Sequence, residues 1–323
     1  MKTLVTGGAG YIGSVCVEQL LDAGHEVTVF DNLSEGHRSA VDPRARWVQG
    51  CLSDPEDVVV ALNASGAEAV LHFAAFALVG ESMTNPGKYF RNNVACGINL
   101  LDACVTADVR KIVFSSTCAT YGIPDSVPIT ETQLQKPINP YGESKLLFEH
   151  ILPWYQAIHG IEFVAFRYFN AAGASPLRGE HHRIETHLIP NILKVALGQS
   201  SAVDILGTDY PTPDGTCVRD YIHVIDLADA HIRALRPGIQ GFFNLGNGEG
   251  YSVRQVIDAC RRVSKHPIPA NEKPRRPGDP PRLVGDPAKA RKELGWNPRY
   301  PDIEQIVATA WDWHQRHPTG YPD

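Results

Sequence analysis

Short apolar runs alternate with amphipathic stretches through the first half of the chain. Runs rich in Val, Ile, Leu and Phe lie at residues 2–6, 26–30, 69–73, 111–115 and 162–168, and each has the length of a buried strand. Apolar residues recur at helical spacing between them, at 13–23, 54–65, 89–107 and 141–159. Strands that alternate with helices are typical of βαβ units with right-handed crossovers, so the pattern predicts an α/β fold with a Rossmann-type, doubly wound parallel sheet.

The texture of the chain changes near Ala171. Gly, Pro, His and charged residues become frequent, and the strand–helix rhythm fades, although helical spacing persists at 187–197, 226–235, 252–263 and 303–314. We therefore expect a Rossmann domain over residues 1–170. Residues 171–323 are expected to form mainly a smaller mixed α/β domain, with some later segments returning to the first.

Composition narrows the class of protein. The chain has 323 residues and a net charge of -6, which disfavours non-specific binding of nucleic acid. Its seven cysteines are scattered without a CxxC pair, which fits reduced thiols in a cytoplasm. The longest apolar stretch, 69–80, is too short to span a membrane. The first strand-like run starts at Lys2, so no secretory signal is expected.

A glycine-rich turn, Thr6–Gly13 (TGGAGYIG), follows the first strand and opens the first helix. Glycines there permit a tight turn and let backbone N–H groups and the helix N-terminus approach a pyrophosphate. Asp31 ends the second strand, where a carboxylate accepts hydrogen bonds from a ribose and repels an added 2′-phosphate. The pattern favours NAD over NADP, although the neighbouring His37 and Arg38 weaken that preference.

Tyr141 and Lys145 are the candidate catalytic pair. Asn139 and Pro140 suit a helix start, and a spacing of four places the two side chains on one helix face. A free tyrosine has a pKa of about 10, so a tyrosine base at neutral pH needs a shift of roughly three units. A nearby cation supplies about one to three units. We expect Lys145 to supply much of the shift and a positively charged nicotinamide to supply the rest.

Thr117 ends the strand that begins at residue 111, at the carboxyl edge where open α/β sheets bind ligands. Its hydroxyl there is placed to hydrogen-bond a reacting oxygen. Capping of the strand end explains a threonine at this position equally well.

The sequence resembles the extended short-chain dehydrogenase/reductase family and, within it, the nucleotide-sugar 4-epimerases. The likeness covers nearly the whole chain. The opening LVTGGAGYIGS and the later YGESK mark the wider family, and RYFN, DGTCVRDYIHV and RRPGD are more specific. Further matching segments are DNLSEG, HFAA, LVGES, NNV, FSST, NLGNG and WHQRHPTGYPD.

The resemblance implies reversible C4 epimerisation of UDP-glucose and UDP-galactose through a 4-keto sugar, with hydride passing to and from bound NAD+. It assigns Tyr141 as the base, Lys145 as its electrostatic partner and Thr117 as a hydroxyl that contacts the sugar. The implied cofactor residues are Gly7, Gly10, Tyr11, Ile12, Gly13, Asp31, Asn32, Leu33, Ser34, Gly36, Cys51, Leu52, Phe73, Ala74, Ala75, Asn92, Tyr141, Lys145 and Phe169. The implied substrate residues are Thr117, Tyr141, Asn170, His187, Leu188, Asp204, Leu206, Arg219, Arg276, Asp279 and Leu283. The diphosphate suits Arg219 and Arg276, because a guanidinium pairs with phosphate oxygens, although either arginine also fits a surface salt bridge.

Four positions depart from the pattern of the best-known bacterial members. Cys51 stands where an aspartate contacts adenine, and Ala77 stands where some members have a lysine near the cofactor. Thr117 replaces a serine and keeps the hydroxyl. Leu283 replaces a large aromatic that narrows the sugar pocket. The hypothesis follows that this chain also accepts the N-acetylated sugars UDP-GlcNAc and UDP-GalNAc.

Other readings remain open. A 4,6-dehydratase needs an Asp-Glu pair after the strand-end threonine, where this chain has Cys118-Ala119. A uronic-acid epimerase, decarboxylase or reductase on the same fold is an alternative. A non-catalytic NAD sensor would not need Tyr141, Lys145 and Thr117 together. A metal hydrolase built on His181, His182 and His187 lacks a carboxylate-backed zinc spacing, so no metal site is expected.

The resemblance also implies a homodimer with a four-helix interface. The contributing segments would be 89–107 and 141–159, and small residues such as Ala95, Gly97 and Ala103 permit close helix packing. Burial in the core of one chain would give the same pattern.

Overall fold

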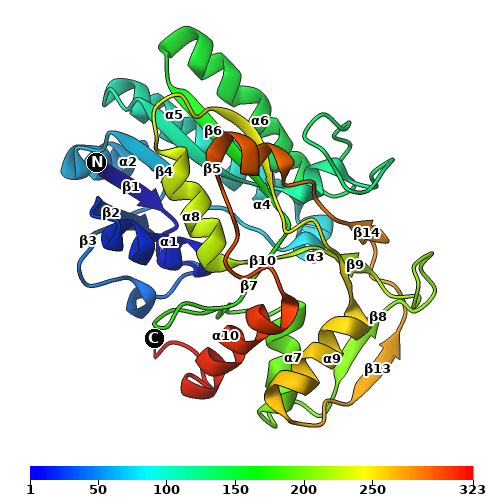
Figure 1. The fold of residues 1–323 in the computed structure, drawn as a ribbon. Coiled ribbons are helices and arrows are strands. Elements are labelled where there is room, and N and C mark those ends of the chain that lie inside the picture. The colour runs from blue at the N-terminus through cyan, green and yellow to red at the C-terminus, as the bar shows by residue number, and fades with distance from the viewer. Residues whose placement is uncertain (323) are drawn as a thin grey trace.

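The computed structural model describes residues 1–322, and a parallel seven-stranded sheet forms its centre (Figure 1). The strand order is β11-β6-β5-β4-β1-β2-β3, and every neighbouring pair is parallel. This arrangement confirms the predicted fold class. The strands are β1 (Lys2–Thr6), β2 (Glu26–Asp31), β3 (Arg46–Gln49), β4 (Ala69–His72), β5 (Lys111–Thr117), β6 (Glu162–Tyr168) and β11 (Gly241–Leu245).

Helices cover both faces of the sheet. On one face, α1 (Tyr11–Asp22) and α8 (Val224–Ala234) pack on the sheet and bury one apolar cluster. On the other face, α2 (Pro55–Ser65), α5 (Cys96–Thr106) and α6 (Pro140–His159) bury a second cluster. The central strands are apolar along most of their length because both of their faces are covered.

Two strands of this sheet were not predicted from the sequence. β3 is a half-exposed edge strand with the sequence RWVQ, which shows no clear apolar run. β11 lies beyond residue 170 and nevertheless pairs with β6, and α8 packs beside α1. Segments from the later half of the chain therefore complete the sheet layer. The domain boundary at residue 170 stays a prediction.

The helix predicted over residues 89–107 is not one regular helix. The segment contains the end of α4 (Pro86–Tyr89), a π-helical stretch at Phe90–Ala95, and then α5. The apolar pattern identified the helical segment, but side-chain spacing does not distinguish a π-helical stretch from an α-helix. A short helix, α3 (Val79–Thr84), precedes α4.

A second lobe lies beside the carboxyl end of the sheet (Figure 1). Three helices share its apolar cluster: α7 (Leu188–Ala196), α9 (Val253–Ser264) and α10 (Ile303–Arg316). Its short strands pair as β7–β10, β12–β9–β14 and β8–β13. Their bounds are β7 (Asn170–Ala172), β8 (Val203–Leu206), β9 (Val218–Arg219), β10 (Tyr221–His223), β12 (Tyr251–Ser252), β13 (Ala270–Lys273) and β14 (Arg282–Leu283).

The direction of chain winding reverses next to β1. From β1 the chain adds β2 and β3 on one side, and then adds β4, β5 and β6 on the other. Open α/β sheets bind ligands in the crevice that such a reversal creates at the carboxyl ends of the strands. Within residues 1–322, no helix combines the length and apolar character needed to cross a membrane.

Candidate functional site

The glycine turn lies at the carboxyl end of β1. Gly7 has φ of 73°, and a Cβ added there would lie 2.5 Å from the backbone nitrogen of Ala74. A Cβ on Gly13 would lie 2.2 Å from the carbonyl oxygen of Gly7. Glycine is required at both places, because only a bare backbone lets the turn, β4 and the start of α1 approach so closely. The N-terminus of α1 is thereby directed at the cleft.

Asp31 fixes the far side of this turn. Its carboxylate accepts hydrogen bonds from the backbone N–H of Ala9 at 3.0 Å and of Leu33 at 2.8 Å. Burial raises the pKa of Asp31, while these N–H groups lower it. Each oxygen keeps a lone pair, so the carboxylate can still accept from a ribose hydroxyl. The glycine cradle, the helix N-terminus and Asp31 together fit an adenine dinucleotide.

A cleft runs from the turn across the ends of β2 and β4. The predicted cofactor residues that line it are Gly7, Gly10, Asp31, Asn32, Ser34, Gly36, Cys51, Leu52, Phe73, Ala74, Ala75 and Asn92. Phe30, Glu35, Gly50 and Phe76 also line it and are not among the predicted cofactor residues. The Cys51 sulfur accepts hydrogen bonds from Ser53 Oγ at 3.0 Å and from Asn32 Nδ2 at 3.4 Å.

Four other predicted cofactor residues lie outside the lining of this cleft. The Tyr11 hydroxyl donates to the carbonyl of Gly173 at 2.6 Å, which ties α1 to the second lobe. Ile12 packs against the core, and Leu33 holds a left-handed backbone with φ of 61°. Phe169 packs with Leu283 in a small apolar cluster.

Tyr141 lies in the first turn of α6. The Asn139 side chain caps that helix by accepting from the N–H of Gly142 at 2.8 Å, and Pro140 follows it, as predicted. The Tyr141 side chain is half-buried, and the neighbouring Thr117 hydroxyl lowers its pKa. Thr117 Oγ1 also accepts the N–H of Ala119 at 3.1 Å, so its own proton is free to point at Tyr141.

Lys145 lies one turn farther along α6 and is buried. Its ammonium donates to the carbonyl of Ser115 at 2.7 Å and lies 4.8 Å above the centre of the Phe114 ring. Burial lowers the pKa of Lys145 to about 7, while Glu149 raises it. Burial raises the pKa of Tyr141 to about 12, while Thr117 lowers it. The protein alone therefore does not make Tyr141 a phenolate at neutral pH.

Glu149 and Arg167 form a buried ion pair that sequence reasoning missed. They lie 2.8 Å apart, and both side chains are almost fully covered. Glu149 also accepts from Ser116 of β5, next to Thr117. The pair thus joins α6, β5 and β6 directly beneath the catalytic residues. Its only sequence signal is that Glu149 follows Tyr141 and Lys145 at successive intervals of four.

Two arginines meet one carboxylate in the second lobe. Arg276 donates from Nε and Nη2 to Asp279 at 3.0 and 2.9 Å, and Arg219 Nη2 lies 3.6 Å from Asp279. Asp279 thereby holds both guanidinium groups near one another. The structure brings together these three predicted substrate residues.

The other predicted substrate residues lie around this lobe. Leu283 is buried and pairs in register with Arg219, and the Asn170 side chain donates to the carbonyl of Asp220 at 3.0 Å. His187 and Leu188 start α7. Asp204 and Leu206 share the exposed face of β8, so their described contacts are with β13 rather than with the arginines.

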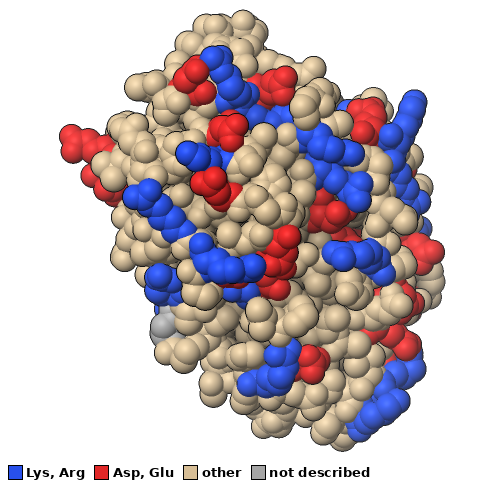
Figure 2. All heavy atoms as spheres, turned by 60° about the vertical axis from the view of Figure 1, so that its left-hand side comes forward, with Lys and Arg blue, Asp and Glu red and all other residues tan. Residues whose placement is uncertain are grey.

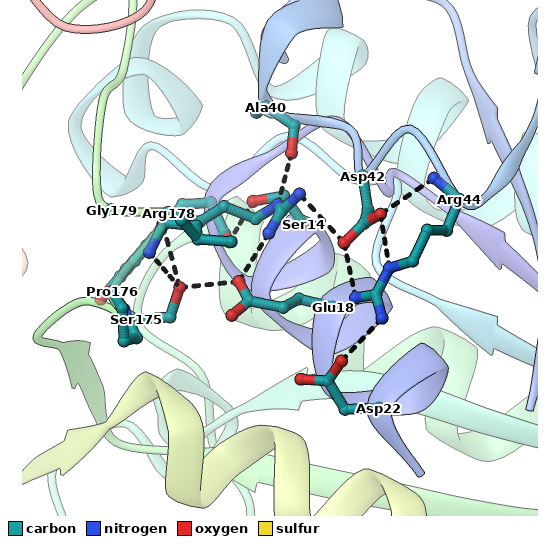
Figure 3. Close-up of polar contacts among 12 residues, drawn as sticks. Ser14, Glu18, Asp22, Ala40, Asp42, Arg44, Ser175, Pro176, Arg178 and Gly179 are labelled. Atoms are coloured by element: carbon teal, nitrogen blue, oxygen red, sulfur yellow. Dashed lines mark hydrogen bonds and ion pairs between the residues drawn. The ribbon is translucent and has the colours of Figure 1, made fainter. Parts of the chain in front are cut away.

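Arg178 ties the second lobe to the segment that follows Asp31 (Figure 3). This buried arginine contacts Glu18 of α1 at 2.7 Å, Asp42 at 3.2 Å and the carbonyl of Ala40 at 2.8 Å. Ser175 donates to the same Glu18 at 2.7 Å. The network fixes the segment after Asp31 against α1.

Four side chains converge between α1 and α7. His187 Nδ1 lies 2.9 Å from Glu180 and 3.2 Å from Glu185, and His182 Nε2 lies 3.2 Å from Glu180. Burial lowers the pKa of His187, but Glu180 and Glu185 outweigh it and raise that pKa to about 10. His181 was weighed in the sequence as a metal ligand together with His182 and His187. It lies outside this group of four side chains and stacks on His37.

Comparisons with known proteins agree on one family. Residues 3–246 match the NAD dependent epimerase/dehydratase family. A UDP-glucose 4-epimerase from Lacticaseibacillus casei is 52% identical, and the alignment spans 100% of this chain and 99% of that protein. The solved structure of a UDP-glucose 4-epimerase from Bifidobacterium longum, in complex with NAD+ and UDP, is 38% identical with a TM-score of 0.95, over 99% of this chain and 100% of that one. The structure of a UDP-Glc/GlcNAc 4-epimerase from Campylobacter jejuni is 40% identical with a TM-score of 0.84, over 98% and 99% of the two chains. The chain therefore belongs to the NAD dependent epimerase/dehydratase family and, within it, to the UDP-glucose 4-epimerases.

Proposed function

We propose that the chain catalyses the reversible C4 epimerisation of UDP-glucose and UDP-galactose with tightly bound NAD+. The observation that carries the proposal is the placement of Tyr141 and Lys145 on α6 next to the strand-end Thr117, at the same carboxyl edge of the sheet as the cleft that fits an adenine dinucleotide. The relative named UDP-glucose 4-epimerase from Lacticaseibacillus casei supports the proposal, and so does the Bifidobacterium longum structure solved with NAD+ and UDP.

Tyr141 would take the proton of the sugar 4-hydroxyl and later return it. Thr117 would donate to the same oxygen, because Ala119 is the donor in its contact with Thr117 Oγ1 and leaves the hydroxyl proton free. Bound NAD+ would supply a hydride acceptor for C4 and a positive charge near the tyrosine. That charge matters because burial alone holds the pKa of Tyr141 at about 12.

The diphosphate of the substrate would lie at Arg219 and Arg276. Two guanidinium forks match two phosphate groups, and Asp279 already holds the forks close together. Asp279 would then keep the arginines oriented before the substrate arrives. Asn170, His187 and Leu188 would complete the contacts with the nucleotide-sugar, with Asp204 and Leu206 at the edge of β8.

The proposal is tested by following UDP-galactose in the presence of the purified enzyme by proton NMR. We expect the galactose H1 signal to be replaced by that of UDP-glucose until the two reach equilibrium, with no other sugar product. Elimination to a 4-keto-6-deoxy sugar would identify a dehydratase instead. An unchanged spectrum with NAD+ supplied would remove the proposed reaction.

Substrate breadth depends on Leu283, which is buried with Phe169 and Tyr121 beside the proposed sugar site. We propose that this aliphatic side chain leaves room for an N-acetyl group at C2. The Campylobacter jejuni relative named for both UDP-Glc and UDP-GlcNAc supports that breadth. We expect the enzyme to turn over UDP-GlcNAc at a rate comparable to its rate with UDP-glucose. An absence of UDP-GlcNAc turnover would exclude the idea.

The proposed assembly is a homodimer through α5 and α6. Leu147, Trp154 and Ile158 are exposed apolar residues on one face of α6, at spacings that continue its helical stripe. A second copy would cover this face by making a bundle of four helices. On the face drawn in Figure 2, acidic and basic side chains are interspersed, which offers no continuous basic surface for nucleic acid. The seven free cysteines support a place in the cytoplasm.

A further inference from the structure

We propose that Glu180, His182, Glu185 and His187 form a binding site for a divalent transition-metal ion of the zinc class. Only His187 of these four residues is also placed at the substrate in the reaction proposed above, and the binding test below needs no turnover, so failure of one proposal is distinguishable from failure of the other. Each of the four residues offers one ligand atom, and these atoms all lie within 4.8 Å of one another.

The spacing of the donor atoms suits one small ion. Neighbouring donors in a tetrahedral zinc site with bonds of about 2.0–2.2 Å lie roughly 3.3–3.6 Å apart. The three closest nitrogen–oxygen separations in this cluster are 2.9, 3.2 and 3.2 Å. An ion therefore needs the ion-paired side chains to move slightly apart, and the most distant donors, up to 4.8 Å apart, to move together.

The chemistry of the set selects the class of metal. Two imidazole nitrogens with two carboxylate oxygens favour Zn²⁺, Ni²⁺ or Co²⁺, whereas Mg²⁺ and Ca²⁺ prefer sites made only of oxygen. Four protein ligands also make a closed site, which is typical of a structural rather than a catalytic zinc.

Burial and charge explain what an ion would stabilise. The Glu180 and Glu185 side chains are only 6% and 4% exposed, and their ion pairs are with His182 and His187. Both carboxylates face the single Nδ1 of His187, which has one proton to share. A divalent ion would balance both negative charges at once, and the half-exposed His187 leaves it a path from solvent.

The surroundings hold the ligands in place. Glu180 follows directly on the segment that Arg178 anchors to α1 (Figure 3), and the backbone N–H of His187, the residue before α7, donates to Glu185 at 2.8 Å. His182 also makes an edge contact with the ring of Tyr11, the first residue of α1. A bound ion would cross-link the loop of residues 180–187 between the cofactor helix and the second lobe.

The test is a titration of the EDTA-treated holoenzyme with Zn²⁺ in competition with a chromogenic chelator. We expect one equivalent to bind, and His182→Ala to weaken binding by on the order of 100-fold or more. The matched control is His181→Ala, which removes the adjacent histidine outside the cluster and should leave the affinity within roughly threefold of wild type.

A second readout needs no variant. Co²⁺ in the wild-type site should give the intense visible bands of tetrahedral coordination, without a thiolate charge-transfer band, because no cysteine belongs to the set. Failure of wild type to bind Zn²⁺ more tightly than His182→Ala would overturn the proposal and leave protonated His187 as the partner of both carboxylates. Equal losses in the two alanine variants, or an octahedral Co²⁺ spectrum, would overturn it as well.

Discussion

Tyr141 is the side chain on which the proposed reaction depends most. Replacing it with phenylalanine removes the proton acceptor and leaves the ring packing beside Tyr89 in place. We expect kcat to fall by roughly 100-fold or more, the usual contribution of a positioned acid–base group. The matched control is Tyr155→Phe on the same helix, whose hydroxyl contacts Asp102 away from the cleft. Full epimerase activity in Tyr141→Phe would refute the assignment.

Lys145 gives a prediction about pH. Its pKa is 10.5 in an unfolded chain and about 7 in the folded protein without cofactor. Between these values the unfolded chain binds more protons, so this residue makes stability rise with pH. Cofactor-free wild type should gain about 1 kcal/mol per pH unit over Lys145→Met from pH 7.5 to 9.5, in urea unfolding. Parallel stability curves for the two proteins would contradict the buried, neutral lysine.

The sequence predicted the chemical roles of single residues better than it predicted their pKa values. The turn at Gly7 and Gly13 and the carboxylate of Asp31 follow from residues next to one another in a motif or at a strand end. The expected role of Lys145 depends on distances and burial that no motif encodes. Its ammonium binds the carbonyl of Ser115, and burial raises rather than lowers the pKa of Tyr141.

The N-terminal cap of α6 links element to reaction. Asn139 accepts the N–H of Gly142 in the same turn that carries Tyr141. Asn139→Ala should lower the free energy of unfolding by about 1 kcal/mol and should also lower kcat, because the catalytic turn loses its anchor. Asp302→Ala removes the corresponding cap of α10, far from the cleft, and should cost similar stability without the kinetic loss. Equal kinetic effects of the two substitutions would argue against a positioning role for the cap.

Elements with strong periodicity were predicted well, and the misses have physical causes. Helices α2, α6, α9 and α10 lie where the apolar spacing placed them, because each buries one stripe against a sheet or a helix. The small strands β7, β9, β12 and β14 were not predicted, because strands this short show no measurable alternation of apolar and polar residues. Their pairing partners are distant in sequence, so only the tertiary fold fixes them.

At the scale of the whole molecule, Arg178 joins the second lobe to α1 and to the segment that follows Asp31. Replacing it with methionine leaves Glu18 buried without its guanidinium partner and removes one of the two arginines that contact Asp42. We expect a loss of about 3–5 kcal/mol in urea unfolding and a smaller amount of retained NAD per chain. Arg44→Met is the control, because this arginine also pairs with Asp42 but is half exposed, and it should cost far less. Similar losses of unfolding free energy in Arg178→Met and Arg44→Met would show that the buried contacts of Arg178 contribute no more than those of a half-exposed arginine.

In the proposed reaction, hydrogen leaves C4 and returns to the same carbon within one closed site. This is measured with purified protein without added cofactor, UDP-galactose deuterated at C4, and ordinary water as solvent. We expect UDP-glucose that keeps the deuterium at C4, because bound NAD+ would accept the label as deuteride and return it in the second step. Product that has exchanged the label with solvent, or an absence of product from protein shown to contain NAD+, would contradict it.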